Sequence, residues 1–480
     1  MAETSDRGLV TQLRSFPQAF WMLNIMETLE RAAYYGVRTV IPIYIAQADE
    51  INGLHFTQID KGIIFFWWAL VQSLSPMFAG GFADRYGYKR IIASAFTSSI
   101  IGYILMATQR EFYPFLFGCG MVALGTAIFR PGIQGTLVQT MTNKTSSVGW
   151  GMFYMVVNVG GFFGPPLAHF WRGISWPTVF FSSAGILALN YLTLLTYKQP
   201  PFVGERRGGP IQVLKFTLKN IIRPKLFLFI LIMSGFWLMF MQLFDMLPNF
   251  IVDWVDSSMV VGALHLPSFM TVQTPRGMQI AQEWMINMNS GFIVLFVVFV
   301  SWLVSRMRRL SSILIGITIS SVGLVLAGFT TAGYFCIMGI VCFSIGEMLA
   351  SPKMNEYLGV IAPEGQKGLY MGYAYIPQAI GWGYGSIMGG QLYDKMGDKA
   401  NLALHYFANH LGITSGIGRT EAVAKLQEHL RIDAAQVTKL LWDTYDPWKL
   451  WLPFAAIGIL AAIAMFFYGR AARKWEAPGT

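Results

Sequence analysis

Apolar runs of about twenty residues recur along the whole chain, and they constrain its fold more than any other feature. A helix needs roughly 20 apolar residues to cross the ~30 Å hydrocarbon core of a bilayer. Because lipid offers no hydrogen bonds to the backbone, a spanning segment is either a helix or part of a closed barrel. The runs therefore predict an all-α membrane protein. We expect twelve transmembrane helices, at about 16–47, 57–82, 88–108, 113–141, 146–170, 176–197, 224–252, 284–305, 310–331, 333–360, 367–393 and 448–469.

The composition agrees with a membrane protein. Of the 480 residues, 54% are hydrophobic and 12% are charged, whereas soluble domains carry roughly 25% charged residues. The three cysteines fall inside apolar runs, so we expect packing thiols rather than disulfides. The first run, from Phe16, holds Glu27, Glu30 and Arg31. The apolar core of a signal peptide would not contain these charges, so no cleaved leader is expected.

The net charge of +10 is distributed unevenly between the two sides of the predicted membrane. With a cytoplasmic N-terminus, most Lys and Arg residues lie in inner loops and tails, while the short outer loops hold only Lys61, Arg110 and Arg172. Basic residues collect on the cytoplasmic side, so we predict that both termini are cytoplasmic. Topology in the lipid bilayer accounts for the basic excess, and no nucleic-acid partner is expected. The lack of long tails favours a bacterial inner membrane over a eukaryotic plasma membrane.

Two halves are visible in the order of the spans. Six spans precede a basic segment and six follow it, which predicts an N-terminal six-helix bundle (1–197), a cytoplasmic linker (198–223) and a C-terminal six-helix bundle (224–480). Basic loops follow spans 2 and 8, at matching places, as in a duplicated secondary transporter whose site lies near the midplane. Two outer insertions, about 253–283 and 394–447, break the symmetry. Three roles stay open for these insertions: they cap the outer face, they contact a partner, or they are loops exposed to solvent.

Ionisable groups inside a span cost roughly 2.5–3.5 kcal/mol each to insert, so each one is a functional hypothesis. On one face of the first span, at spacings of four, three and four, lie Glu27, Arg31, Tyr34 and Arg38. Glu27 and Arg31 form an i,i+4 pair, and Glu30 lies beside them. Desolvation disfavours the charge of a carboxylate and a neighbouring Arg favours it, so this group can act as a proton site. A self-neutralising structural pair is the alternative.

Other polar groups fall inside later spans, namely Arg130, Asn158, Gln242, Asp245, Asn289 and Glu347. A lone Asn or Gln often only joins helices. Arg130 and Glu347, by contrast, lack an opposite charge within one turn of their own helices. Spans 4 and 10 are equivalent in the two halves, so we expect these side chains to face each other across a central cavity. They would bind the two ends of a zwitterion, or pair directly and brace a closed state.

The loop after span 2 reads Gly-Gly-Phe-Ala-Asp-Arg-Tyr-Gly-Tyr-Lys-Arg over 80–90. It resembles the signature loop of the major facilitator superfamily, which acts in gating between the inner ends of the helices. The resemblance assigns Asp84, Arg85 and Arg90 to gating. It also implies a major facilitator fold, in which two six-helix bundles rock around a central site. Without the Gly-Gly, a generic cytoplasmic charge cluster would look similar.

Four ordered motifs resemble those of the proton-coupled oligopeptide transporter (POT) family. Span 1 reads Glu-Thr-Leu-Glu-Arg-Ala-Ala-Tyr-Tyr-Gly-Val-Arg over 27–38, similar to E-x-x-E-R-F-x-Y-Y-G-x-R without its Phe. Span 5 reads Phe-Tyr-Met-Val-Val-Asn-Val-Gly over 153–160. Span 7 has Phe-Trp and a later Gln over 236–242, and span 10 has Gly-Glu and Ser-Pro over 346–352. Ala362-Pro363 and Met371-Gly372 also fit, and the ordered matches together cover about residues 20–390, which argues against chance.

By this resemblance Glu27, Glu30 and Arg31 couple protons. The peptide pocket would be lined by Tyr34, Tyr35, Arg38, Arg130, Asn158, Gln242, Asn289 and Glu347. In the family the counterpart of Glu347 meets the amino end of the peptide, and basic residues of the first half meet its carboxylate. A span-1 Arg closes the outer face by pairing with a span-7 acid, which here leaves Asp245 as the partner of Arg38.

Three positions depart from the family pattern: Arg130 stands for a Lys, Met241 for an acid and Ala374 for an aromatic residue. Guanidinium is harder to deprotonate than an amine and binds carboxylates as a fork, so the pocket is remodelled. We predict a proton-coupled symporter that imports small peptides or a related zwitterionic solute, with H⁺ as the coupling ion and no cofactor. The alternative solute is a modified amino acid, a carboxylate or an amphiphile.

An enzyme and a receptor-like protein that binds without moving its solute are the rivals from other classes. The six His residues are scattered in loops and span ends and form no His-x-x-x-His or Glu-x-x-His pair. Zinc and nucleophilic sites need such clusters, so we predict neither an enzyme nor a metal site.

Overall fold

The computed structural model describes residues 9–142, 145–196, 223–305, 307–362, 370 and 372–476, and most of them are helical. The first half contains α1 (Leu9–Arg14), α2 (Gln18–Ala46), α3 (Gln58–Tyr86), α4 (Tyr88–Thr108), α5 (Phe112–Gln139), α6 (Ser146–Arg172) and α7 (Trp176–Thr196). The second half contains α9 (Pro224–Phe240), α10 (Gln242–Asp245), α11 (Leu247–Trp254), α13 (Gln282–Ser305), α14 (Arg309–Gly328), α15 (Gly333–Ile361), α17 (Tyr375–Leu392) and α21 (Trp451–Glu476).

These helices confirm the twelve-span layout to within a few residues at most ends. Span 7 differs, because it consists of three consecutive helices, α9, α10 and α11. The second break precedes Pro248, which lacks the N–H that a continuous helix would need. Span 11 is described as a continuous helix only from Tyr375. Of the predicted linker 198–223, only Arg223 belongs to the described residues.

Seven of the described helices are long and apolar enough to cross a membrane by length and composition alone. They are α4, α5, α7, α9 with α10, α14, α15, and α21 with the turn before it. Helix α2 is long enough but carries Glu27, Glu30, Arg31 and Arg38. These charges lower the mean hydropathy of α2, although a span that carries them can still cross the membrane inside a bundle.

The chain forms two compact units, and α2 and α3 contribute to both. Unit 1 comprises residues 1–37 and 70–220, and unit 2 comprises 38–69 and 221–480. The far ends of α2 and α3, with the turn between them, therefore pack with elements of the second half. The two units group residues that pack together, and they do not coincide with the two halves of the sequence. The division into bundles 1–197 and 224–480 therefore stays a prediction.

Small residues bring the helices of each unit close together. In unit 1 a Cβ added to Gly102 of α4 would lie 2.6 Å from the carbonyl oxygen of Gly118 on α5. In unit 2 a Cβ added to Gly323 of α14 would lie 2.8 Å from the carbonyl oxygen of Gly339 on α15. Close backbone approach through small residues is how helices associate in lipid. Spans 3 and 4 thus pack as spans 9 and 10 do.

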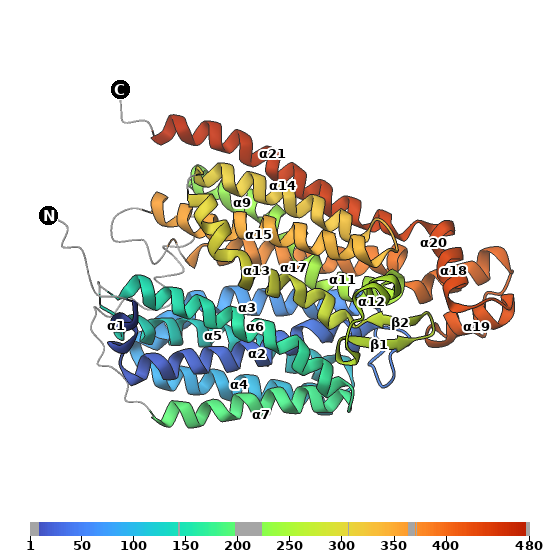
Figure 1. Ribbon diagram of the computed structural model, residues 1–480, viewed down its shortest axis with the longest axis horizontal. Helices are drawn as coiled ribbons and strands as arrows, with labels where there is room; N and C mark the ends of the chain where they lie inside the picture. Colours follow the sequence, from blue (N-terminus) through green and yellow to red (C-terminus); the bar gives the residue numbers. More distant parts are fainter. Residues whose placement is uncertain are drawn as a thin grey trace. The chain divides into compact units, whose positions relative to one another are not determined.

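The two insertions lie at one end of unit 2, here called the insertion end, away from the last residues of α21 (Figure 1). The first holds α12 (Ser258–Leu264), the 3-10 turn η1 (Ser268–Met270) and an antiparallel hairpin of β1 (Thr271–Thr274) and β2 (Gly277–Ile280). The second holds the π-helical turn η2 (Tyr393–Gly397), α18 (Lys399–His410), the 3-10 turn η3 (Arg419–Glu421), α19 (Ala422–Leu430), α20 (Ala434–Tyr445) and the 3-10 turn η4 (Pro447–Leu450).

Residues 419–441 of the second insertion form separate short helices rather than one continuous helix. Arg431 ends α19 in the left-handed conformation, with φ 57°. Asp433 then caps α20, and its side chain accepts a hydrogen bond from the backbone of Gln436. The reversal lets α19 and α20 fold back on α18, so the insertion is a small helical subdomain.

Candidate functional site

The acid–base group predicted on α2 is buried in unit 1. Arg31 donates to Glu30 over 2.5 Å, and its Nε lies 3.4 Å from Oε1 of Glu27. The side chains of all three are at most 4% exposed. Thr126 of α5 donates to the other oxygen of Glu30 over 3.1 Å. Oε2 of Glu27 has no hydrogen-bond partner among the described residues.

Aromatic and basic side chains surround this group. The guanidinium of Arg31 lies 5.1 Å from the ring centroid of Tyr34 and 5.8 Å from that of Tyr35, within range of cation–π attraction. The hydroxyl of Tyr34 donates to Gln72 of α3 over 2.9 Å. Arg130 lies four residues after Thr126 on α5, and its charge acts on Glu27 together with that of Arg31. Unit 1 therefore joins two acids and two guanidinium groups.

Arg38 of α2 and Asp245 of α10 form a buried ion pair in unit 2. The second oxygen of Asp245 accepts from Trp382 over 3.0 Å and from Ser386 over 2.9 Å, both on α17. The guanidinium of Arg38 also lies 4.4 Å from the ring centroid of Phe65 on α3. Four helices thus meet at this pair, and each carboxylate oxygen has a donor.

A further buried polar network continues from this pair toward the insertion end. Lys61 of α3 is 1% exposed and donates to Asn249 of α11 over 2.8 Å. Asn249 in turn donates to Gln47 over 3.1 Å, and Gln47 donates to Asp253 over 2.8 Å. Tyr393 donates to the other oxygen of Asp253 over 2.7 Å. The chain of bonds ties the α2–α3 turn to α11 and η2.

This network is not predicted from the sequence, because Lys61 is expected in an outer loop. A lysine near the end of a span is ordinarily read as reaching to water. One signal was present, because Asp245, Asn249 and Asp253 recur at intervals of four and mark one polar face. A face of that kind in span 7 needs a cation, and Lys61 and Arg38 supply it.

Glu347 of α15 is oriented by a neighbouring helix. The amide of Asn289 on α13 donates to Glu347 over 2.9 Å and lies 2.9 Å from the hydroxyl of Ser344. Ser344 donates to the carbonyl of Ile340 in its own helix over 2.7 Å. The carboxylate is therefore held by a neutral amide donor.

Two other predicted pocket residues donate to backbone carbonyls four residues earlier in the same span. Asn158 donates to the carbonyl of Tyr154 over 2.8 Å. Gln242 donates to the carbonyl of Leu238 over 2.7 Å, and its oxygen has no hydrogen-bond partner among the described residues. Their binding roles stay predictions.

The structure describes only part of the predicted gating loop, residues 80–90. The structure describes the backbone of Asp84 and Arg85 in α3 but not their side chains, while Arg90 is exposed on α4. Across the described ranges, no cluster of three or more His, Cys, Asp and Glu could hold a metal ion. The three cysteines are free thiols.

Known proteins resemble the chain over most of its length. A family model for the Major Facilitator Superfamily matches residues 23–386. The multidrug resistance protein MdtH of Yersinia enterocolitica is 22% identical over 394 residues, which is 81% of this chain and 89% of MdtH.

Two solved structures share the fold. A POT family transporter in complex with 5-aminolevulinic acid is 16% identical, with a TM-score of 0.66 over 91% of this chain and 99% of that one. Another, in complex with a thioalcohol-conjugated peptide, is 16% identical, with a TM-score of 0.68 over 96% of this chain and 99% of that one. Since the family model matches well over half of its residues, the chain belongs to the Major Facilitator Superfamily and is a multi-pass membrane transporter, not an enzyme.

Proposed function

We propose that the chain is a proton-coupled symporter of the POT type that imports small peptides or a related zwitterionic solute by alternating access. The observation that carries this proposal is the buried group in which Glu27 and Glu30 share the guanidinium of Arg31. Two carboxylates around one guanidinium carry a net negative charge whenever no second guanidinium balances them. Burial makes such a charge costly, and a proton neutralises it.

Arg130 gives the proposed coupling its link to the solute. Its charge acts on Glu27, so two acids and two bases balance when no solute is bound. A solute carboxylate that binds Arg130 as a fork would compete for that charge. Glu27 would then bind a proton to restore neutrality, and solute and proton would move together. The membrane potential supplies about 2.3 kcal/mol per 100 mV for each charge carried inward.

Glu347 is the proposed site for the amine of the solute. Its donor Asn289 is neutral, so this hydrogen bond does not balance the charge of an ionised Glu347, which a cationic ligand could do. We assign Asn289 to positioning Glu347 as well as to the pocket. A zwitterion bound by Glu347 and Arg130 would satisfy both charges at once.

The ion pair of Arg38 and Asp245 is the proposed outer gate. This assignment places the insertion end outside the cell and both termini in the cytoplasm, as the basic loops favour. A bacterial inner membrane is the proposed location, and the proton is the proposed coupling ion. Opening to the outside would require Arg38 to leave Asp245, which binds elements of the second half.

A non-peptide solute is the second candidate. It is favoured by the likeness to a protein named for multidrug resistance. It is also favoured by Arg130, Met241 and Ala374, which depart from the POT pattern. A modified amino acid, a carboxylate or an amphiphile would suit such a pocket.

Uptake into proteoliposomes tests the proposal. A panel of radiolabelled dipeptides and 5-aminolevulinic acid is measured with and without an imposed inward proton gradient. Accumulation that needs the gradient supports symport, whereas equilibration that ignores it contradicts proton coupling. N-acetylation of an accepted peptide should raise its apparent Kd in the wild type and matter much less in Glu347→Gln. Equal losses in both proteins would mean that Glu347 does not bind the amine.

A further inference from the structure

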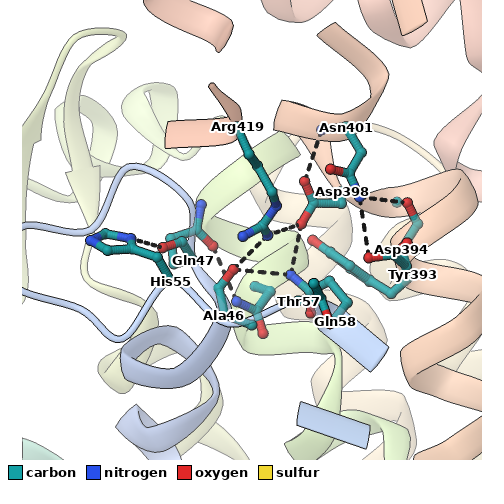
Figure 2. A network of polar contacts seen from close by, with 12 residues as sticks. Ala46, Gln47, His55, Thr57, Gln58, Tyr393, Asp394, Asp398, Asn401 and Arg419 are labelled. Atoms are coloured by element: carbon teal, nitrogen blue, oxygen red, sulfur yellow. Dashed lines mark hydrogen bonds and ion pairs between the residues drawn. The ribbon is translucent and has the colours of Figure 1, made fainter. Parts of the chain in front are cut away.

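Arg419, in the second insertion, binds both ends of the turn that joins α2 to α3 (Figure 2). Its guanidinium donates to the carbonyl of Ala46 over 2.7 Å and to that of Phe56 over 3.2 Å. Ala46 ends α2 and Phe56 shortly precedes α3. The last carbonyls of a helix lack partners within the helix and need outside donors. One side chain from the second half thus closes this turn.

Asp398 adds a second tie to the same turn. It is 2% exposed, and its carboxylate forms an ion pair with Arg419 and accepts from Gln58 of α3 over 2.9 Å. The other carboxylate oxygen caps α18 by accepting from the backbone of Asn401 over 3.0 Å. Gln58 is itself fully buried. The ties are therefore largely shielded from water, where charge-assisted bonds are strong.

The insertion is fixed to the second half at its other side. Trp254, the last residue of α11, donates to the carbonyl of Gly397 over 2.7 Å. Trp254 also packs its ring against Trp442 of α20, with centroids 5.7 Å apart. Lys399 donates to Thr438 over 2.5 Å and joins α18 to α20. The helical subdomain is thus part of unit 2, and Arg419 and Asp398 bind the turn from it.

We propose that Arg419 and Asp398 form an outer latch that holds the α2–α3 turn against the second half and must release it in every transport cycle. Transporters of this superfamily expose their site by rocking the first half against the second. The turn belongs to the first half by sequence, so the outside cannot open while the latch is bound. The latch differs from the Arg38–Asp245 pair, because it is built by an insertion outside the spans. It rests on alternating access, not on the proposed solute or proton.

Thiol labelling of the outer half of α2 tests the latch without any solute. Thr39 is 5% exposed in unit 2. Thr39→Cys is placed in a protein whose three cysteines are replaced by Ala, and its reaction with a membrane-impermeant maleimide is followed from the outside. Arg419→Gln and Asp398→Asn should each speed labelling by about tenfold or more, since each removes a charge-assisted bond from the closed state. Arg419→Lys should give an intermediate rate, because an ammonium cannot bind three acceptors as a fork.

Matched controls come from the same insertion. Arg431 is exposed, and Lys425 pairs with Glu421 at the surface, with side chains 40% and 47% exposed. Arg431→Gln and Lys425→Gln should label at the wild-type rate. Wild-type labelling in both Arg419→Gln and Asp398→Asn, in protein with an unchanged circular dichroism spectrum and Tm, would overturn the latch.

A cross-link gives a second measurement if those variants fold poorly. Gln58 and Asp398 are in direct contact, so Gln58→Cys with Asp398→Cys should react with a short bis-methanethiosulfonate, which forms a reducible disulfide with each thiol and releases two sulfinates. The linked protein should protect a cysteine at position 39 by at least about tenfold, and reduction should restore labelling. In the cross-linking experiment the cross-linker is added before the maleimide. Labelling of the linked protein at the unlinked rate would show that the latch need not open, and would also overturn the proposal.

Discussion

Lys61 of α3 donates a hydrogen bond to Asn249 of α11 over 2.8 Å, and both side chains are buried. The negative charges of Asp245, Asp253 and Asp398 all act on this ammonium. Its Nζ also lies 5.2 Å from the ring centroid of Tyr393. Lys61 is therefore the second cation, after Arg38, in a cluster of acids that comes from the second half.

Removing Lys61 should cost both stability and transport. Lys61→Met removes a buried hydrogen bond to Asn249 and a positive charge that acts on Asp253, and a buried polar group left without its partner costs about 1–3 kcal/mol. We expect a lower Tm and uptake reduced by about tenfold or more, measured in detergent and in proteoliposomes. Lys439→Met, at an exposed position of α20, is the control. A Lys61→Met protein with normal Tm and uptake would show that the cluster does not depend on this cation.

Exchanging the two charges of the proposed outer gate should restore part of its function. Arg38→Ala and Asp245→Ala should each impair uptake, and Arg38→Asp with Asp245→Arg should recover some of it. Recovery is expected to be incomplete, because Trp382 and Ser386 donate to residue 245 and would face a guanidinium. A double-mutant cycle of the alanine variants measures the coupling, and simple additivity would mean that the two residues act independently.

Neutralising either acid on α2 should separate accumulation from exchange. Glu27→Gln and Glu30→Gln are expected to abolish gradient-driven accumulation and to spare solute exchange, since only net transport needs the proton to bind and leave. Glu30→Gln should also lower Tm more than Glu27→Gln. Glu30 is bound by Arg31 and Thr126, whereas Glu27 has one oxygen without a hydrogen-bond partner among the described residues. Accumulation at the wild-type rate in both variants would rule out this coupling site.

Lys399 should make the stability of the insertion depend on pH. Burial, with the charge of Arg276 nearby, lowers the pKa of Lys399 to about 7, against ~10.4 in an unfolded chain. The unfolded state thus binds more protons, so stability falls as the pH drops from ~10 to ~7 and levels off below that. Lys399→Met should raise Tm more at pH 6 than at pH 9. The same gain at both values, or a matching gain in Lys439→Met, would contradict this origin.

The sequence alone determined the helical framework. Twelve apolar runs end close to where the described helices end, because the thickness of the bilayer fixes the length of a span. The grouping of Glu27, Glu30 and Arg31 also follows from the sequence, since one helix carries all three and its periodicity sets their spacing. The pairing of Arg38 with Asp245 was expected from the family resemblance.

Only the tertiary structure decided what surrounds these groups. Lys61 has a buried role because α10, α11 and the segment from η2 to α18, all far along the chain, bring it acids and a tyrosine ring. Asn289 holds Glu347 from a different helix. The tie between Gln58 and Asp398 joins residues 340 positions apart. Hydropathy and helical period describe one segment at a time, whereas burial and counter-charges depend on which segments pack together, and that is settled by the fold.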